Sequence, residues 1–364
     1  MKNKAKNILI VTISGALIFG GLFLCLFLPK DQYSISERRE LEPFPKVTAS
    51  EVASGRFMAE FENYATDNFP FRDFMRAIKA HIVYDIFRQR ENNGIFIHEG
   101  HIATTDYPYN PDSIEYAASR FQYIYDKYLD NSRVYFSVIP DKGNLLAESA
   151  GVPGYDVGIL VDDLRDKMDY ARYIDILDTL TVDDYYRTDS HWKQECILDT
   201  AKVLAGEMGS EIETELWRIT EEEPFYGVYY GQAAVGGDGD EISYLINEDI
   251  LNMEAYDHQN GKKIPIYDDD KMGGLDPYEI FVGGPVSLVT IENTACQEGK
   301  HLVIFRDSFA SSLAPLLAQG YSKVTLVDIR YISPDYAGRL IDFEEADVLF
   351  LYSATVLNNS KTIK

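Results

Sequence analysis

The strongest hydrophobic pattern in the chain lies near its start. Residues 8–28 form an apolar run whose only polar side chains are Thr12, Ser14 and Cys25. As a helix rising about 1.5 Å per residue, this run would span roughly 30 Å, the hydrocarbon thickness of a bilayer. Three lysines precede it, so the positive-inside rule predicts a cytoplasmic tail at residues 1–7 and an extracytoplasmic body. The run is longer than a signal-peptide core and no small-x-small cleavage site follows, which favours a retained single-pass anchor at 8–28 over a removed signal.

Helical spacing dominates the next hundred residues. Residues 29–50 are polar and interrupted by prolines, as in a juxtamembrane tether. Beyond them, apolar side chains recur at steps of three and four, which is the period of an amphipathic helix. We expect residues 51–130 to form a helical N-terminal portion with a hairpin. The predicted elements are two helices within 49–90 that are separated at Phe69-Pro70, a hairpin over 94–102 and a helix over 116–129.

A different pattern begins at about residue 131. Short apolar runs of strand length alternate there with amphipathic segments of helical length. Such units are typical of a mainly parallel sheet with helices on both faces, and they predict one α/β domain over residues 131–364. The predicted strands are 134–139, 173–177, 301–305, 324–328 and 348–352, and the predicted helices are 159–170, 191–208, 308–317 and 336–340.

Residues 221–280 interrupt this alternation. They are rich in Gly, Asp and Tyr and show weak periodicity, so we interpret them as an insertion of loops and hairpins. Insertions of this length often carry function.

Charge excludes some classes of partner. The 364 residues include 34 Lys+Arg and 59 Asp+Glu, a net charge of −25. Four lysines and no acid lie in the first 30 residues, so the remaining chain has 30 basic and 59 acidic residues and a net charge of −29. Such a body repels phosphate backbones, which argues against nucleic acid and favours a neutral or amino-sugar glycan over an anionic polymer.

Cysteine usage gives little further information. Three cysteines are too few for a disulfide-stapled scaffold. Cys196 and Cys296 lie in the predicted extracytoplasmic part. The sequence does not show whether they meet, so a disulfide and two unpaired thiols both stay open.

Two segments combine residues that can perform nucleophilic catalysis. Residues 185–192 (YYRTDSHW) place Asp189 and His191 two apart, where a carboxylate can hold one imidazole nitrogen and leave the other as a base. Residues 302–310 (LVIFRDSFA) place Ser308 between a strand and a helix, where open α/β sheets bind ligands and backbone N–H groups can stabilise an oxyanion. Singly, these residues are also compatible with helix caps and an interior histidine. Their occurrence together favours the catalytic interpretation.

The segments resemble the DHHW family of bacterial surface proteins, which is related to the AlgX/AlgJ polysaccharide O-acetyltransferases of the SGNH-hydrolase superfamily. The resemblance extends over roughly residues 32–355. One position departs from the family signature, because Ser190 replaces a histidine. The motifs, in order, are 37–41 (ERREL) with 44–46 (FPK), 65–72 (ATDNFPFR), 138–142 (VIPDK), 189–192 (DSHW), 281–285 (FVGGP), 307–309 (DSF) and 328–331 (DIRY).

The resemblance implies an SGNH-hydrolase-like fold and a Ser308–His191–Asp189 triad, with Asp-x-His before Ser in the chain. In these roles Ser308 is the nucleophile, His191 takes its proton and Asp189 holds the imidazole tautomer. The Ser308 amide is the first expected oxyanion donor, and Gly283 or Gly284 is the second. The family also implies a membrane-bound acyltransferase partner that supplies acetyl groups.

Three further residues are weaker substrate-site candidates. Lys142 follows a strand end and either orients substrate or is a solvated loop lysine. Arg330 and Tyr331 follow another strand and either line the cleft or form an ion pair and a core ring.

No metal or cofactor is predicted. Asp238-Gly-Asp240 and residues 268–270 lack the spacing of a calcium loop, so solvated turns are the favoured interpretation. His98 and His101 have no third zinc ligand nearby, and no phosphate-loop or dinucleotide motif occurs.

The sequence therefore predicts a membrane-anchored extracytoplasmic enzyme. It would transfer or remove acetyl esters on a cell-surface or exported polysaccharide through an acyl-Ser308 intermediate. Transfer and hydrolysis share that intermediate and differ only in the acceptor. The alternative is a non-catalytic glycan-binding or assembly protein that keeps the fold.

Overall fold

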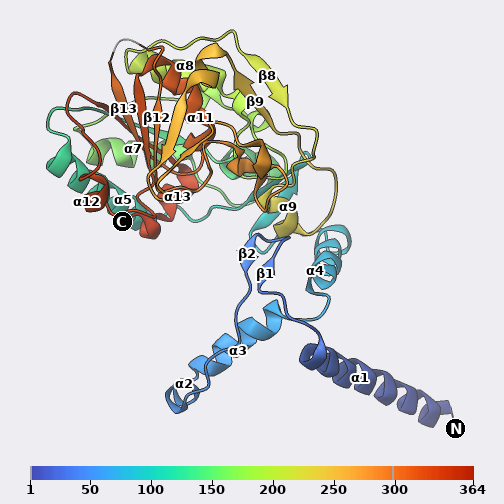
Figure 1. Ribbon diagram of the computed structural model, residues 1–364. Coiled ribbons are helices and arrows are strands. Elements are labelled where there is room, and N and C mark those ends of the chain that lie inside the picture. The colour runs from blue at the N-terminus through green and yellow to red at the C-terminus, as the bar shows by residue number, and fades with distance from the viewer. Residues whose placement is uncertain (1, 297–298) are drawn as a thin grey trace. The chain divides into compact units, whose positions relative to one another are not determined.

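The computed structural model describes residues 2–296 and 299–364, which form two compact units (Figure 1). The first unit comprises the described residues up to Gln89 together with Gly231–Gly236. The second comprises Arg90–Tyr230 and Gly237–Lys364 and contains the large sheet.

The first unit begins with the apolar helix α1 (Lys2–Phe27). Among the described residues it is the one helix long and apolar enough to cross a membrane, over Lys4–Cys25. The predicted separation at Phe69-Pro70 is confirmed, because these residues lie between α3 and α4. The other elements are the hairpin β1 (Tyr33–Ser34) and β2 (Arg39–Glu40), α2 (Ala49–Ser54), α3 (Arg56–Asp67), α4 (Arg72–His81) and a π-helical turn at Ile82–Ile86.

Ion pairs connect the hairpin region of this unit to α3 and α4. Arg39 binds the buried Asp67 carboxylate through both terminal nitrogens, at 2.7 and 2.6 Å. Glu37 contacts Arg72 at 2.6 Å and Arg76 at 3.2 Å. The hydrogen bonds from Arg39 are the main reason that the pKa of Asp67 falls to about 2. The motifs 37–41 and 65–72 are therefore joined to each other, which gives them a structural role.

The second unit is built on an eight-stranded sheet with the order β11-β10-β12-β14-β13-β15-β6-β7. The five strands from β14 to β7 are parallel, and β12, β10 and β11 extend the sheet as antiparallel strands. The sheet is thus mainly parallel, as predicted. Its strands are β6 (Arg133–Ile139), β7 (Arg172–Tyr173), β10 (Glu254–Asp257), β11 (Lys262–Ile264), β12 (Leu288–Glu292), β13 (His301–Arg306), β14 (Lys323–Val327) and β15 (Asp347–Ser353).

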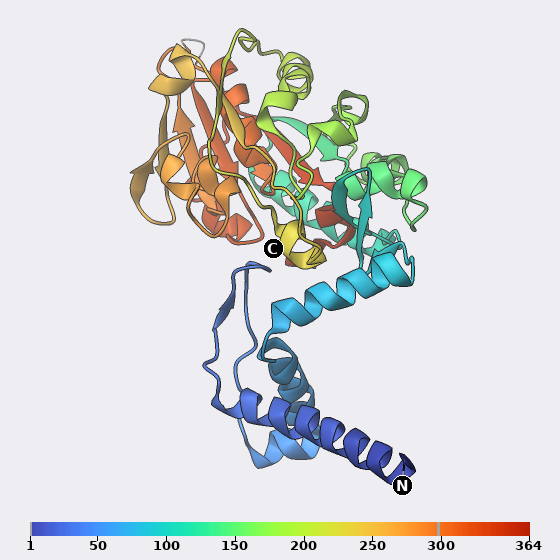
Figure 2. The ribbon, with the colours of Figure 1, turned by 90° about the vertical axis from the view of Figure 1, so that its right-hand side faces the viewer.

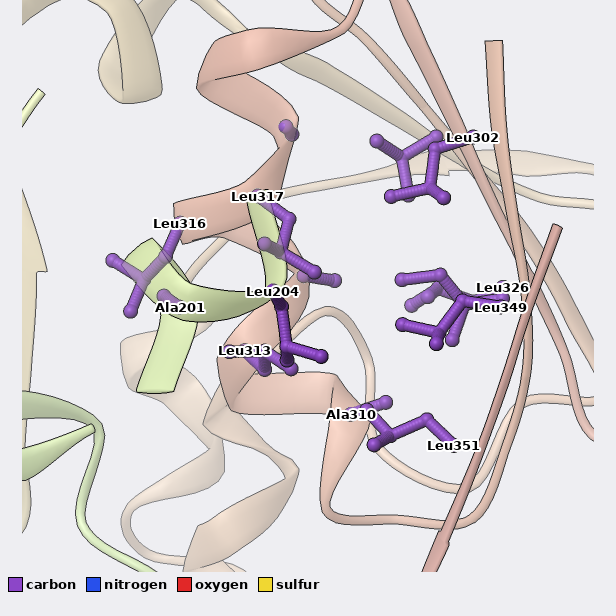
Figure 3. Close-up of a cluster of buried hydrophobic side chains, with 14 of the residues drawn as sticks. Ala201, Leu204, Leu302, Ala310, Leu313, Leu316, Leu317, Leu326, Leu349 and Leu351 are labelled. Atoms are coloured by element: carbon purple, nitrogen blue, oxygen red, sulfur yellow. The ribbon is translucent and has the colours of Figure 1, made fainter. Parts of the chain in front are cut away.

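Alternate side chains of the central strands enter two different cores. Leu302 and Ile304 pack in the core beneath α8 (Leu198–Glu207) and α11 (Ala310–Leu317). Val303 and Phe305 pack on the other face, under α5 (Pro111–Tyr128), α7 (Val157–Lys167), α12 (Pro334–Ala337) and α13 (Ala354–Asn358). Figure 3 shows the leucines of β13, β14 and β15 pointing toward α11, and Figure 2 shows the sheet from the side. Each fully buried side chain of this size contributes about 1.5–3 kcal/mol, so helix α11 is held firmly against the strand that precedes it.

Two predicted elements are shorter than expected. The predicted strand 173–177 pairs only at Arg172–Tyr173, because the Asp175 side chain accepts the Leu177 N–H and turns the chain into a 3₁₀ helix. The predicted helix 191–208 begins only at Leu198. Residues before it form a tight β-like loop in which Tyr185 bridges Trp192, and this loop carries the candidate catalytic pair.

The insertion 221–280 contains hairpins, as expected, but it also extends the main sheet. Its strands β10 and β11 form the antiparallel edge beside β12. The remaining elements are a separate hairpin of β8 (Trp217–Thr220) with β9 (Ser243–Ile246), and α9 (Val228–Ala233) and α10 (Glu248–Asn252). The predicted early hairpin is confirmed as β4 (Ile95–His98) and β5 (His101–Thr104), and Cys25, Cys196 and Cys296 are free thiols.

Candidate active site

Ser308 lies where the sequence pattern predicts, in the turn between β13 and α11 at the carboxyl edge of the parallel strands. The buried Asp307 side chain holds this turn in place. Its Oδ1 accepts the Phe309 N–H at 3.1 Å and its Oδ2 accepts the Ser353 N–H at 2.8 Å. Since Ser353 ends the adjacent strand β15, Asp307 ties the turn to the sheet and leaves the partly exposed Ser308 at the edge.

The Asp189–His191 loop brings its two side chains to Ser308. His191 Nε2 lies 2.7 Å from Ser308 Oγ, and His191 Nδ1 lies 2.6 Å from Asp189 Oδ1. Asp189 Oδ1 also accepts the His191 backbone N–H at 3.1 Å, and its Oδ2 accepts the Val228 N–H at 2.9 Å. The predicted proximity of the three side chains is confirmed, and it joins residues 117 positions apart in the chain.

The electrostatics of this pair favour a carboxylate beside the imidazole. The Asp189 side chain is 2% exposed and the His191 side chain 12%. Burial by itself would raise the pKa of Asp189, but the charge of His191 and hydrogen bonds from His191 and Val228 hold it well below its usual range. An ionised Asp189 accepts a hydrogen bond from Nδ1–H, which keeps the proton on Nδ1 and leaves the Nε2 lone pair free to take the Ser308 hydroxyl proton.

Aromatic side chains surround the imidazole, and one of them, Tyr278, was not identified from the sequence. The Tyr278 ring stacks on His191 with centroids 3.8 Å apart, and its hydroxyl lies 2.8 Å from Ser312 Oγ. The Phe309 ring lies beside the imidazole with centroids 5.0 Å apart, and Trp192 Nε1 donates to the Phe309 carbonyl at 3.1 Å. Tyr278 belongs to the weakly periodic insertion, where no pattern in the sequence indicates that a ring will reach His191.

Lys142 is placed differently from either expectation. It is neither at a surface open to substrate nor solvated, because its side chain is only 1% exposed. Its ammonium donates to the backbone carbonyls of Tyr186 at 2.7 Å, Arg187 at 3.2 Å and Asp189 at 2.6 Å. Lys142 comes just after strand β6, and its long side chain extends into the interior because three backbone carbonyls of the 186–189 loop accept its hydrogen bonds there.

The two glycines adopt the backbone that only glycine takes easily, with φ of +73° at both Gly283 and Gly284. The Gly284 amide already donates to the Phe281 carbonyl at 3.1 Å within a turn, and its carbonyl accepts from the buried Arg306 at 3.4 Å. Because the Gly284 N–H is already bonded, the Gly283 N–H is the preferred candidate for the second oxyanion donor. This role stays a prediction.

Arg330 forms the expected ion pair, since its guanidinium binds both oxygens of Asp328 at 2.9 and 2.7 Å. The ring of Tyr331 is 56% exposed, so it is not a core ring. A cleft-lining role for either residue stays a prediction.

Side chains of the two acidic segments, 238–240 and 268–270, accept hydrogen bonds from other parts of the chain. Asp240 is 6% exposed and accepts hydrogen bonds from Thr188, which corrects the interpretation of the 238–240 segment as a solvated turn. Asp269 accepts from the Tyr244 hydroxyl at 3.2 Å. His98 and His101 lie opposite each other across the β4–β5 hairpin. Within residues 2–296 and 299–364, no group of three metal-ligating side chains comes together.

Solved structures share this fold. A DHHW family protein from Eubacterium siraeum is 22% identical over 75% of this chain and 95% of its own, with a TM-score of 0.61. Bacillus cereus PatB1 is 19% identical over 73% of this chain and 97% of its own, with a TM-score of 0.59. A further structure of PatB1, with a sulfonyl adduct, gives a TM-score of 0.57 at 19% identity over 72% of this chain and 95% of its own.

More distant comparisons add little. The O-acetyltransferase domain of Pseudomonas putida AlgJ is 9% identical over 73% of this chain and 92% of its own, and its TM-score of 0.46 does not by itself establish a common fold. No protein-family model and no curated protein matches the chain. The relationship that the motifs predicted is thus confirmed at the level of the fold.

Proposed function

We propose that this chain is a serine-dependent O-acetyltransferase or acetylesterase that acts on a cell-surface or exported polysaccharide. The observation that carries the proposal is the continuous hydrogen-bonded path from Asp189 through His191 to Ser308, with distances of 2.6 and 2.7 Å. These are the distances at which a base can take a proton from a hydroxyl nucleophile. A helix cap or an interior histidine would need only one of the two bonds.

The reaction proceeds in two balanced halves. Ser308 Oγ attacks the acetyl carbonyl carbon while its proton moves to His191 Nε2, and the developing imidazolium is stabilised by the Asp189 carboxylate. The ester C–O bond then breaks, and the leaving alkoxide takes the proton from His191. In the second half, an incoming hydroxyl gives its proton to His191 and its oxygen attacks the carbonyl carbon of acyl-Ser308. The bond between that carbon and Ser308 Oγ breaks, the acetyl group stays on the acceptor oxygen, and Ser308 Oγ takes the proton back from His191.

Backbone N–H groups are the hydrogen-bond donors for the oxyanion that forms during the reaction. The Ser308 amide stands in the turn that precedes α11, where the N–H groups and the helix dipole stabilise negative charge on the carbonyl oxygen. We assign the second donor to Gly283. Removing one such donor from an oxyanion hole costs about 2.7–4 kcal/mol of transition-state stabilisation in other hydrolases.

The net charge of the chain and its N-terminal helix support the substrate class and the location in this proposal. A body with a net charge of −29 suits a neutral or amino-sugar glycan. Helix α1 retains the enzyme at the membrane with its body on the extracytoplasmic side, where the acceptor hydroxyls are. For transfer, a membrane-bound acyltransferase supplies the acetyl group; for hydrolysis, water replaces the sugar hydroxyl.

A sulfonyl fluoride tests the nucleophile directly. When phenylmethanesulfonyl fluoride reacts, an Oγ–S bond forms, the S–F bond breaks, fluoride leaves and the hydroxyl proton goes to His191. We expect stoichiometric labelling of the full chain in detergent, measured by intact mass, and none in Ser308→Ala or His191→Ala. The report of a sulfonyl adduct on PatB1 supports this choice of probe.

The second half of the test uses cells. Surface-glycan acetylation in cells with the wild-type chain is compared with that in cells with Ser308→Ala at equal expression. A change in acetylation supports the proposal, and its direction separates transfer from hydrolysis. An unlabelled wild-type serine together with unchanged acetylation would contradict it and favour the non-catalytic glycan-binding alternative.

A further inference from the structure

The buried Lys142 ammonium is the central group of a cluster of contacts around the loop 186–189. Its three contacts to the carbonyls of Tyr186, Arg187 and Asp189 match the three N–H donors of an ammonium. The ring of Tyr229 lies 5.2 Å from Nζ and closes another side. These contacts turn three carbonyl groups of one short loop toward a single cation.

The N–H groups of the same loop face a carboxylate. Asp240 accepts the backbone N–H of Arg187 and of Thr188, both at 2.8 Å, and the Thr188 hydroxyl at 2.6 Å. Since Asp240 is 6% exposed and Lys142 1% exposed, both charges are largely removed from water. The 186–187 and 187–188 peptide groups therefore have their carbonyls on the cation and their N–H groups on the anion, so their dipoles are aligned between the two charges.

A third segment completes the enclosure of the loop. Thr188 Oγ1 accepts the Gly227 N–H at 2.9 Å, and the Thr188 carbonyl accepts the Tyr230 N–H at 3.1 Å. A Cβ at position 227 would lie 2.3 Å from Asp189 Cβ, so only glycine allows this approach. The approach brings the Val228 N–H to Asp189 Oδ2, so the same loop contacts that enclose the backbone also orient the carboxylate.

Burying the Lys142 ammonium costs free energy, which indicates that the cluster does more than pack the 186–189 loop against its neighbours. A buried ammonium is expensive unless it is fully hydrogen-bonded, and apolar side chains of similar volume often stabilise a fold as well or better. Burial lowers the pKa of Lys142 to about 7, although the Asp189 and Asp240 carboxylates oppose that shift. What the charged pair adds over apolar packing is direction, because each charge fixes the orientation of particular peptide groups.

We propose that Lys142 and Asp240 are positioning residues for the Asp189–His191 pair, and that they act by holding the 186–189 backbone between an ammonium and a carboxylate. The proposal rests on the proposed function, since it assigns a purpose to the orientation of Asp189. Neither residue touches the reacting atoms. Both act through Asp189, which in turn sets the imidazole tautomer and plane.

The test compares two variants with a matched control. Lys142→Met removes the charge and keeps the length of the side chain, and Asp240→Asn removes the opposite charge and keeps its shape. Lys202→Met is the control, because Lys202 is an exposed lysine of α8 that donates to Asp199 at 2.8 Å and lies outside the 185–193 loop. All chains are full length and in detergent, and only the folded fraction is compared.

Two readouts are needed. The first is the rate at which phenylmethanesulfonyl fluoride labels Ser308. The second is the downfield proton NMR signal of the His191 Nδ1–H, assigned by its loss in His191→Gln. We expect labelling about tenfold or more slower in both variants, with a shifted or broadened signal, because a displacement of about 1 Å at a catalytic group costs up to about 10²-fold. The control should differ from wild type by less than about twofold.

Three other outcomes would overturn the proposal that Lys142 and Asp240 position His191 through Asp189. Folded variants that label at the wild-type rate with an unchanged signal would overturn the proposal, and so would slow labelling with an unchanged signal, since the effect would then bypass Asp189. Failure of both variants to fold would assign the pair to folding alone and also overturn it. If wild-type Ser308 does not label, the proposed function fails, and the NMR signal still decides whether the two residues position His191.

Discussion

The imidazole of His191 lies flat against the ring of Tyr278, with centroids 3.8 Å apart and planes within 8° of parallel. The two residues come from different parts of the fold, the tight loop 185–193 and the insertion. The stack allows the imidazole to move in its own plane toward Ser308 but opposes its rotation out of that plane. Tyr278 thus restricts rotation of the imidazole out of its plane, a motion that the hydrogen bond to Asp189 leaves free.

Two substitutions at Tyr278 separate its ring from its hydroxyl. Tyr278→Phe keeps the stack and loses the bond to Ser312, so we expect a loss of about 0.5–1.5 kcal/mol in the free energy of unfolding and sulfonyl labelling within a few-fold of wild type. Tyr278→Leu also loses the ring contact, worth about 0.5–1.5 kcal/mol beyond area burial, and should label much more slowly. Equal labelling rates for both variants would show that the stack does not restrict His191.

Catalysis and folding should respond separately at the triad. Ser308→Ala removes one hydroxyl, whose partner in the structure is His191 Nε2, so the free energy of unfolding should fall by about 0.5–1.5 kcal/mol, as for one lost hydrogen bond. Asp189→Asn keeps the shape but allows the wrong imidazole tautomer. By analogy with another serine hydrolase, we expect turnover on an acetylated model sugar to fall by about 10⁴-fold. Melting temperature and turnover are measured on both variants, and activity that only follows the folded fraction would return these residues to a structural role.

The buried Lys142 gives stability a pH dependence with a definite sign. Its pKa is about 7 in the folded chain and 10.5 for an ordinary lysine, so between these values the unfolded chain binds more protons. Wild-type stability should therefore rise with pH between about 7 and 10.5, relative to Lys142→Met, which has no such group. The measurement is the melting temperature of both chains across this interval. A difference that stays constant with pH would mean that Lys142 keeps an ordinary pKa.

The acidic body predicts weak interaction with polyanions. With a net charge of −29 outside the first 30 residues, the chain should prefer neutral or amino-sugar glycans to anionic polymers when no divalent cation is present. Binding is measured by calorimetry for a neutral glycan and for a teichoic-type polyphosphate at low and high salt. Tight polyphosphate binding that weakens with salt would contradict the prediction and require a local basic surface.

The sequence made some features of this chain predictable because they depend on local periodicity. The 8–28 run, the separation at Phe69-Pro70 and the strands that became β6, β13, β14 and β15 follow from apolar spacing. The candidate catalytic residues also lie in short motifs, and the resemblance of those motifs to the DHHW family implied that the three side chains act together. Ser308 stands at a strand-to-helix turn, and Asp189 and His191 are neighbours in the chain, so short motifs carry all three.

Tertiary structure alone decided what surrounds those motifs. No local pattern places Tyr278 on His191, because the two residues are far apart in the chain and the insertion has no clear period. The sequence also left Lys142 as a substrate ligand or a solvated lysine, since its burial depends on carbonyl groups that turn inward 44 to 47 residues later. Asp240 was interpreted as part of a solvated turn for the same reason. Hydrophobic spacing reports which face of an element is buried, whereas the partner of a buried polar group depends on where distant backbone donors and acceptors come to lie, and only the folded chain fixes that.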